Sequence, residues 1–320
     1  MSRAETNKTV LVAGAANLIL TFTKLVAGLL AGSSAMLAET AHSAADTLNQ
    51  GFLYASLRRS ARPPDPRHPF GYGNERYFWS LLAAFGIFVA GAGFSIFEGI
   101  LTMTGHGGEG TQVWLAYAVL GLGVVLEGGS WVRAFTQARR ETRDNGRDLV
   151  DHVRRTPDVT FKAALFEDSA AVVGLAIAAA GLTLREITGS SFWDGLASVL
   201  IGLLLVTVAL ALGRDSMGLL IGRAADPADL RRIRAEIVGA DGVTGVDELL
   251  TMHFGPDELL VAAKVHFSDA ISADEAEDVA GEIDRRLRER VPIVRHVFLD
   301  PTQRPRPAED APSVIKDSSG

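Results

Sequence analysis

Long apolar stretches are the feature that most limits how this chain can fold. We identify six of them, at residues 9–31, 33–57, 77–104, 113–134, 161–184 and 192–212. A helix needs about 20 mainly apolar residues to cross the ~30 Å hydrocarbon core of a bilayer. In that core only helices and closed barrels satisfy their own backbone hydrogen bonds. The pattern therefore predicts an all-α bundle of six transmembrane helices that sits in the lipid bilayer.

The charges between these stretches predict their orientation. The connections at 58–76 and 133–155 are rich in arginine, whereas those at 32–33, 105–110 and 185–191 carry little charge. Basic connections tend to stay in the cytoplasm. We therefore expect a multi-pass membrane protein with both termini in the cytoplasm, in a bacterial inner or plasma membrane.

The remainder of the chain is charged and has the character of a soluble domain. Predicted elements follow in the order α-β-β-α-β, at residues 227–238, 246–254, 259–267, 272–290 and 293–299. Ser272 and Glu275 have the spacing of a capping box. We predict a transmembrane domain over 1–222, a cytoplasmic α+β domain of ferredoxin-like type over 223–303, and a disordered tail over 304–320, where Pro, Ser and charged residues dominate.

Composition argues against several classes of protein. The chain has no cysteine, which excludes disulfides and thiolate metal sites. A formal net charge of -7 and the lack of a basic patch argue against a nucleic-acid partner. The sequence contains no phosphate-binding loop of the Gly-x-x-x-x-Gly-Lys-Ser/Thr type, so nucleotide-driven pumping has no support. We expect neither an enzyme nor a catalytic cofactor.

The second stretch carries ionisable residues where apolar ones are expected. His42 and Asp46 are four residues apart and so share one face of a helix, which Asn49 continues. An ionisable group in a transmembrane helix costs roughly 2.5–3.5 kcal/mol on insertion scales. An imidazole with a carboxylate suits a divalent first-row metal ion. The alternative is a buried His–Asp hydrogen bond that only joins helices.

The whole arrangement resembles the cation diffusion facilitator family of metal/proton antiporters. The resemblance rests on the order of the apolar stretches and on four motifs: 42–46, His68-Pro-Phe-Gly-Tyr-Gly73, the acidic pair Glu167–Asp168, and Phe298-Leu-Asp-Pro301. It implies a homodimer that exports a divalent cation, with zinc expected first, in exchange for protons by alternating access. Two alternatives stay open: transport of manganese, iron, cobalt, nickel or cadmium, and a membrane-anchored metal sensor or scaffold without flux.

The resemblance also implies a set of metal ligands, namely His42, Asp46 and Asp168. The family usually has a histidine four residues before the aspartate of the fifth span, and Ala164 stands there in this chain. Glu167, Asn49 and water are the candidates for a fourth ligand. Adjacent residues of a helix point about 100° apart, so Glu167 and Asp168 should not face one site unless the helix bends.

Peripheral metal positions are implied in two further places. Asp65 and His68 lie in the loop after the second span, with Tyr72 at the third position of the family's site. The corresponding residues of the C-terminal domain are Asp247, His266 and Asp300. The alternative for both groups is a structural role.

Three more ionisable residues lie within or near the apolar stretches. We expect Lys24 to pair with an intramembrane acid such as Glu98 or to extend towards an interface. Glu39 could accept a hydrogen bond from His42, relay protons, or lie at an interface. Glu127, near the end of its stretch, is expected to be structural.

Overall fold

The computed structural model describes residues 3–106, 112–144, 153 and 156–302. The chain forms two compact units. The first comprises Met1–Arg223 with Phe254–Pro256, and the second comprises Ala224–His253 with Asp257–Gly320. The expected disordered tail at 304–320 lies outside the described residues.

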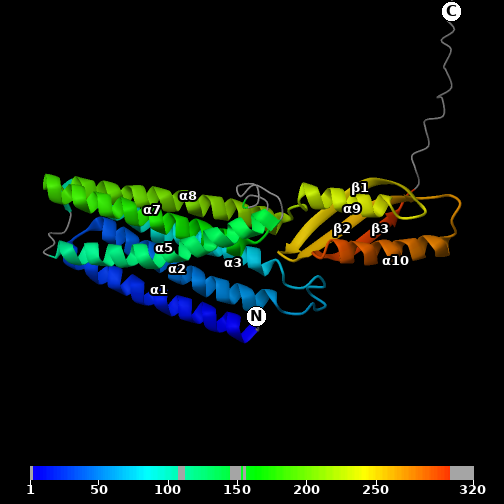
Figure 1. Cartoon of the computed structure of the whole chain (residues 1–320), viewed down its shortest axis with the longest axis horizontal. Helices are drawn as coiled ribbons and strands as arrows, with labels where there is room; N and C mark the ends of the chain where they lie inside the picture. Colours follow the sequence, from blue (N-terminus) through cyan, green and yellow to red (C-terminus); the bar gives the residue numbers. More distant parts are fainter. Residues whose placement is uncertain (1–2, 107–111, 145–152, 154–155, 303–320) are drawn as a thin grey trace, which may run out of the picture. The chain divides into compact units, whose positions relative to one another are not determined.

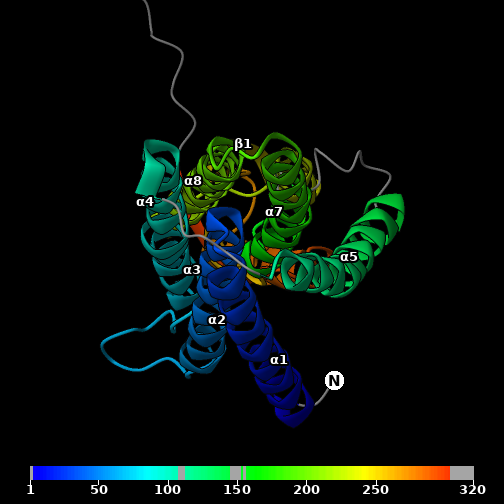
Figure 2. The same ribbon diagram turned by 90° about the vertical axis from the view of Figure 1, so that its left-hand side faces the viewer.

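The first unit is a bundle of long helices (Figures 1 and 2). Its elements are α1 (Arg3–Ala31), α2 (Ser34–Ser60), α3 (Glu75–Gly86), η1 (Ile87–Gly93), α4 (Phe94–Leu101), η2 (Thr102–His106), α5 (Val113–Asp144), α7 (Val159–Thr188) and α8 (Phe192–Ile221). Within the described residues, four stretches are long and apolar enough to cross a membrane: Glu75–Gly105, Val113–Thr136, Val159–Thr188 and Phe192–Ile221. The apolar part of α1, Asn17–Ala31, is shorter.

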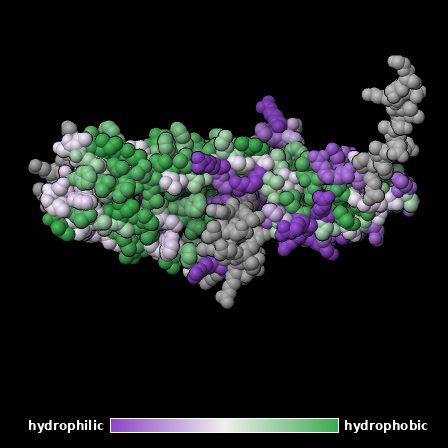
Figure 3. Space-filling view, turned by 90° about the horizontal axis from the view of Figure 1, so that it is seen from above, coloured by the Kyte–Doolittle hydropathy of each residue, from purple (hydrophilic) through white to green (hydrophobic). Residues whose placement is uncertain are grey.

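The surface of this unit supports a membrane location. Large apolar side chains face outward on several helices, among them Phe22 at 65% exposure, Phe85 at 62% and Val125 at 70%. In Figure 3 hydrophobic atoms cover most of the visible surface of the bundle. Burying that area in lipid removes apolar surface from water. The protein is therefore a multi-pass membrane protein.

The third predicted span is not one regular α-helix. Wide π-helical turns, η1 and η2, precede and follow α4. Glycines let this segment approach α8 closely, because a Cβ on Gly99 would lie 2.6 Å from the carbonyl oxygen of Gly195. Single π-helical turns are often found at functional or strained positions, and hydrophobic periodicity does not reveal them.

Local signals explain where the helices next to the site begin and end. Gly32 has a φ of 55° and separates α1 from α2, and the Ser33 side chain accepts a hydrogen bond from the Met36 amide at the start of α2. Asp158 caps α7 by accepting from the amides of Thr160 and Phe161. These caps fix the starting points of two helices that carry candidate ligands.

The second unit contains the predicted helices and a small sheet. Its elements are α9 (Pro227–Val238), β1 (Val243–Gly255), β2 (Glu258–Phe267), α10 (Ala273–Arg290) and β3 (Val294–Pro301), and the strand order is β1-β2-β3. β2 and β3 pair in parallel. The core joins both helices to the sheet through residues such as Ile233, Ile237, Val261, Ile283 and Leu287. The predicted capping box of Ser272 and Glu275 is confirmed.

Candidate metal centre in the membrane unit

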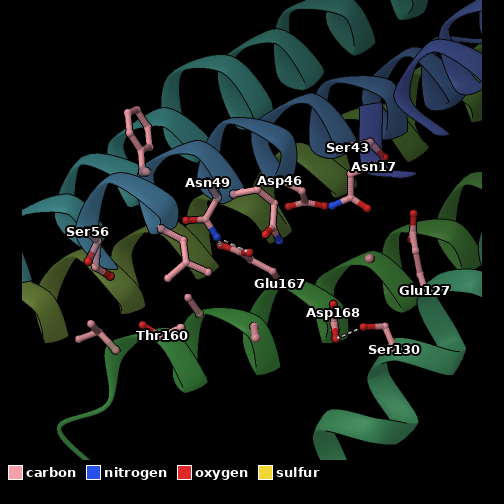
Figure 4. Close-up of a pocket in the computed structure, with 18 of the residues that line it drawn as sticks. Asn17, Ser43, Asp46, Asn49, Ser56, Glu127, Ser130, Thr160, Glu167 and Asp168 are labelled. Atoms are coloured by element: carbon pink, nitrogen blue, oxygen red, sulfur yellow. Dashed lines mark hydrogen bonds between the residues drawn. The ribbon is translucent and has the colours of Figure 1, made fainter. Parts of the chain in front are cut away.

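A cavity of about 380 Å³ lies among α1, α2, α3, α5 and α7. Four carboxylates line it: Asp46, Glu127, Glu167 and Asp168. In Figure 4, Ser56 and Thr160 lie towards one end of the cavity, and Ser43 and Glu127 lie towards the other. The carboxylates therefore gather away from the end marked by Ser56 and Thr160.

The helix α2 carries the first two candidate ligands, of which Asp46 lines the cavity and His42 does not. The distance from His42 Nε2 to Asp46 Oδ2 is 3.7 Å. His42 is only 2% exposed, and neither of its ring nitrogens has a hydrogen-bond partner among the described residues. Asp46 Oδ1 is likewise buried without a described partner. Because unsatisfied buried polar atoms cost free energy, this face of α2 has unused capacity to bind a ligand.

The wall formed by α7 contributes the acidic pair. Glu167 accepts hydrogen bonds from Asn49 Nδ2 on both carboxylate oxygens, each at 2.7 Å. Asp168 accepts one from Ser130 Oγ at 2.9 Å. Glu167 thus faces α2 and Asp168 faces α5, because adjacent residues of a helix point about 100° apart. Both nevertheless line the same cavity along an unbroken helix.

The candidate ligands do not yet converge on one point. Among the residues that the structure describes, no three His, Asp or Glu side chains are grouped closely enough to hold a metal ion. His42, Asp46 and Asp168 therefore need side-chain rotation before they could share an ion. Ala164 also lines the cavity, so a side chain at this position would reach the same space.

Lys24 pairs with two acids, and Glu98 is not one of them. Its ammonium donates to Glu39 Oε2 at 3.2 Å, to Ser43 Oγ at 2.9 Å and to Glu127 Oε1 at 2.6 Å. A buried cation needs such partners because its desolvation is costly. Pairing with an acid was one of two alternatives for Lys24 in the sequence, and the choice among Glu39, Glu98 and Glu127 depends on how the helices pack.

These contacts of Lys24 also change the interpretation of Glu39 and Glu127. Glu39 accepts from Lys24, and a hydrogen bond from His42, one of the three alternatives for Glu39, is absent among the described contacts. Glu127 was expected to be structural, yet it lines the cavity as well as binding Lys24. Ser130 and Ser43 are further lining residues that sequence reasoning missed, because a serine in an apolar helix has no distinctive signal.

The loop candidates form a folded turn. Asp65 accepts from the Tyr72 hydroxyl at 2.7 Å and from the amides of Arg67 and His68 at 2.8 and 2.7 Å. The Tyr72 hydrogen bond, followed by the His68 amide, lowers the pKa of Asp65 to about 2. Asp65 is therefore ionised across the physiological range, and its contacts support the loop-folding role.

The C-terminal candidates are only partly brought together. Asp247 Oδ1 lies 2.7 Å from His266 Nε2, and His266 Nδ1 lies 2.8 Å from the Thr302 carbonyl oxygen. Asp300 is opposite Lys264 in the β2–β3 register. In the described part of this unit, too, no group of three ligands is close enough for a metal ion.

Comparison with known proteins gives matches across both units. Residues 10–221 match the model of the cation efflux transmembrane domain, and residues 225–300 match that of the cation efflux protein cytoplasmic domain.

Three relatives illustrate the range of similarity. The proton-coupled zinc antiporter SLC30A9, mitochondrial, of Xenopus laevis is 32% identical over 92% of this chain and 59% of its own length. Its Homo sapiens counterpart is 33% identical over 82% of this chain and 46% of its own length. The manganese efflux system protein MneP of Bacillus subtilis is 24% identical over 91% of this chain and 94% of its own length. The chain thus spans about half the length of the two zinc antiporters.

Proposed function

This chain belongs to the cation diffusion facilitator family of cation efflux proteins, and we propose that it exports a divalent cation, preferably zinc, in exchange for protons. The metal ion is then the substrate, and the chain acts as a transporter with no catalytic step. The proposal includes a homodimer paired through the second unit, because residues 225–300 match a dimerisation domain of cation efflux proteins.

The acid-lined cavity inside the membrane unit carries this proposal. Charged residues are costly in a bilayer and mark ion pathways when they face a cavity. We assign His42, Asp46 and Asp168 as ligands, with Glu167, Asn49 or water completing the set. Two carboxylates neutralise a divalent ion, and the unsatisfied atoms of His42 and Asp46 offer the first contact.

The direction of access follows from the two ends of the bundle. At one end, the cavity lining reaches Ser56, Arg76 and Thr160, which adjoin the arginine-rich connections. We place this end in the cytoplasm, together with both termini, and interpret all six helical stretches as spans.

Polar contacts close the opposite end of the bundle. Asp194 is fully buried there and accepts from Ser33 Oγ and from the Ser34 amide, each at 2.7 Å. Arg185 lies 3.4 Å from the same carboxylate. Alternating access then requires these contacts to open when the cytoplasmic end closes.

Proton exchange follows from the chemistry of the ligands. Carboxylates and imidazole bind a metal ion only when deprotonated, so protons and metal compete for the same atoms. Protons that enter from the far side would displace the ion there. Metal leaves the cytoplasm while protons enter it.

The identity of the ion is the part that needs a direct test. One imidazole fewer than the family's usual set weakens the preference for zinc, and a manganese efflux protein is among the relatives. We would measure flux into proteoliposomes for zinc, cadmium, manganese, iron, cobalt and nickel. We expect zinc to move fastest. A faster manganese flux would make manganese the preferred substrate. If ions bind but none is transported, a sensor or scaffold would be favoured.

A further inference from the structure

The contacts around Lys24 suggest more than a structural ion pair. We call this group the lysine cluster; it comprises Lys24 of α1, Glu39 and Ser43 of α2, and Glu127 of α5. We propose that the oxygen-bearing side chains of the cluster form a second cation site beside the transport cavity, and that the chain fills this site with its own ammonium group.

The geometry of the cluster is that of a bound cation. An ammonium group has three donors, and the structure gives the Lys24 ammonium three oxygen acceptors at 2.6–3.2 Å. The side chains of Lys24 and Glu39 are both 0% exposed, and that of Glu127 is 14% exposed. The ammonium is therefore held away from water by ligands from two other helices.

The cluster has more ligand capacity than the lysine uses. Glu39 Oε1 and Glu127 Oε2 are buried and have no hydrogen-bond partner among the described residues. The ammonium cannot serve them because its three protons are engaged. Zinc usually takes four ligands, and both oxygens of the two carboxylates would supply that number. The unused oxygens thus indicate a site suited to a larger positive charge.

The fourth side of the cluster is formed by the backbone of α7. A Cβ added to Gly174 would collide with Glu39 Oε1. Only glycine therefore allows α7 to cover the unused oxygen this closely. Gly174 keeps water and lipid away from the cluster without adding a ligand.

The position of the cluster gives it a consequence for transport. Ser43 and Glu127 line the transport cavity together with Asp46. Without the lysine charge, this cavity would offer acidic groups to two ions at once. By occupying the second position, Lys24 limits the cavity to a single transported ion. This limit rests on the proposed function, whereas the second site itself does not.

The test counts zinc ions bound to the full-length protein in detergent, by equilibrium dialysis. Asp46→Ala removes the proposed transport site, and Lys24→Met then vacates the cluster with an unbranched apolar side chain. We expect the Asp46→Ala/Lys24→Met protein to bind about one zinc ion per protomer more than Asp46→Ala alone. Adding Glu127→Gln should abolish this gain. Equal zinc binding by the Asp46→Ala proteins with and without Lys24→Met would overturn the proposal.

The same series separates the two claims. If Asp46→Ala alone binds as much zinc as the wild type, the transport site is assigned wrongly, yet the comparison between the two Asp46→Ala proteins still tests the cluster.

A second arm does not depend on the lysine variant folding. Glu127→Gln, with Lys24 intact, should leave the number of bound zinc ions unchanged, because the ammonium already holds that carboxylate. A loss of bound zinc in this variant would show that metal enters the cluster beside the lysine, which contradicts the proposal. If Lys24→Met is folded but less stable, we expect added zinc to raise its unfolding temperature by more than it raises that of the wild type.

Discussion

At the scale of residues, the candidate ligands differ in how strongly they are engaged by the protein itself. Glu167 is held on both oxygens by Asn49, and Asp168 is held by Ser130. Among the described residues, Asp46 Oδ1 has no hydrogen-bond partner, and His42 Nε2 lies 3.7 Å from Asp46 Oδ2. A metal ion must displace the hydrogen bonds from Asn49 or Ser130 to bind Glu167 or Asp168. It meets no comparable described hydrogen bonds at Asp46. We therefore expect binding to begin on α2.

Asn49 should act as a restraint on Glu167. Asn49→Ala removes two hydrogen bonds to a buried carboxylate, each worth about 1.5–3 kcal/mol when the acceptor is charged. The freed carboxylate becomes available to the metal, so zinc affinity should rise, by about tenfold if one such hydrogen bond is regained as coordination. Isothermal titration gives the affinity, and Gln50→Ala, another lining residue, is the control. A fall in affinity confined to Asn49→Ala would instead make Asn49 a ligand.

Ala164 should determine the preference between metals. Ala164→His places an imidazole in the cavity one turn before Asp168, and nitrogen ligands favour zinc over manganese. We expect the zinc-to-manganese affinity ratio to rise by about an order of magnitude, as measured by competition. Ala163→His, at an adjacent lining position, is the matched control. An unchanged ratio in Ala164→His would mean that position 164 does not face the ion.

Sequence reasoning at this scale found residues that break a local rule. His42 and Asp46 stand out because ionisable groups are costly in an apolar helix. The partners of Lys24 could not be chosen in the same way, because several acids satisfy the charge requirement. The hydrogen bonds from Asn49 and Ser130 depend on the rotation of α2 and α5 about their axes, which periodicity defines only coarsely.

At the scale of elements, the crossing of α4 and α8 depends on glycine. A Cβ on Gly195 would lie 2.7 Å from the Gly99 carbonyl oxygen and 2.7 Å from Met103 Cγ. The backbones of the two helices therefore approach as closely as glycine permits.

Gly195→Ala should separate these helices and destabilise the bundle. Overpacking of this kind costs about 1–3 kcal/mol, which outweighs the gain of up to about 1 kcal/mol in helix propensity. We would compare unfolding temperatures in detergent with those of Gly121→Ala, where an added Cβ meets no atom within 4 Å. Gly121→Ala should be neutral or stabilising. If Gly195→Ala unfolds at the same temperature as this control, the two helices can move apart without loss of stability.

Element boundaries were predictable where capping residues mark them. The helix α9 spans Pro227–Val238 as expected, with Asp226 capping it and Pro at its first turn. The π-helical turns of the third stretch were not predictable, because hydrophobic periodicity does not distinguish them from α-helical turns. β1 begins at Val243, three residues before its predicted start.

At the scale of the whole molecule, the candidate ligands for transport all lie in the first unit. The second unit has its own core of buried apolar residues. The proposed function assigns selectivity to the first unit and subunit pairing to the second.

Truncation after Arg223 should separate these two properties. We expect the dissociation constant of the dimer to rise about tenfold in the shortened protein if pairing loses roughly 1.4 kcal/mol. Transport should be slower as well. The order of preference among metals should stay the same. Mass measurement in detergent and the flux panel would report both properties. A changed order of metals in the truncated protein would place the selectivity site in the second unit.

Proton-driven zinc flux through the cavity at Asp46 tests the central claim most directly. Wild-type protein in liposomes would be given an inward or a collapsed proton gradient, with Asp46→Ala and the uncharged lining variant Ser56→Ala in parallel. In wild type and Ser56→Ala, we expect zinc to move in the direction opposite to the protons, and to move little once an ionophore collapses the gradient. Asp46→Ala should give only background flux at an unchanged oligomer mass. Zinc movement in Asp46→Ala at the wild-type rate, or a wild-type rate that does not respond to the gradient, would contradict the central claim.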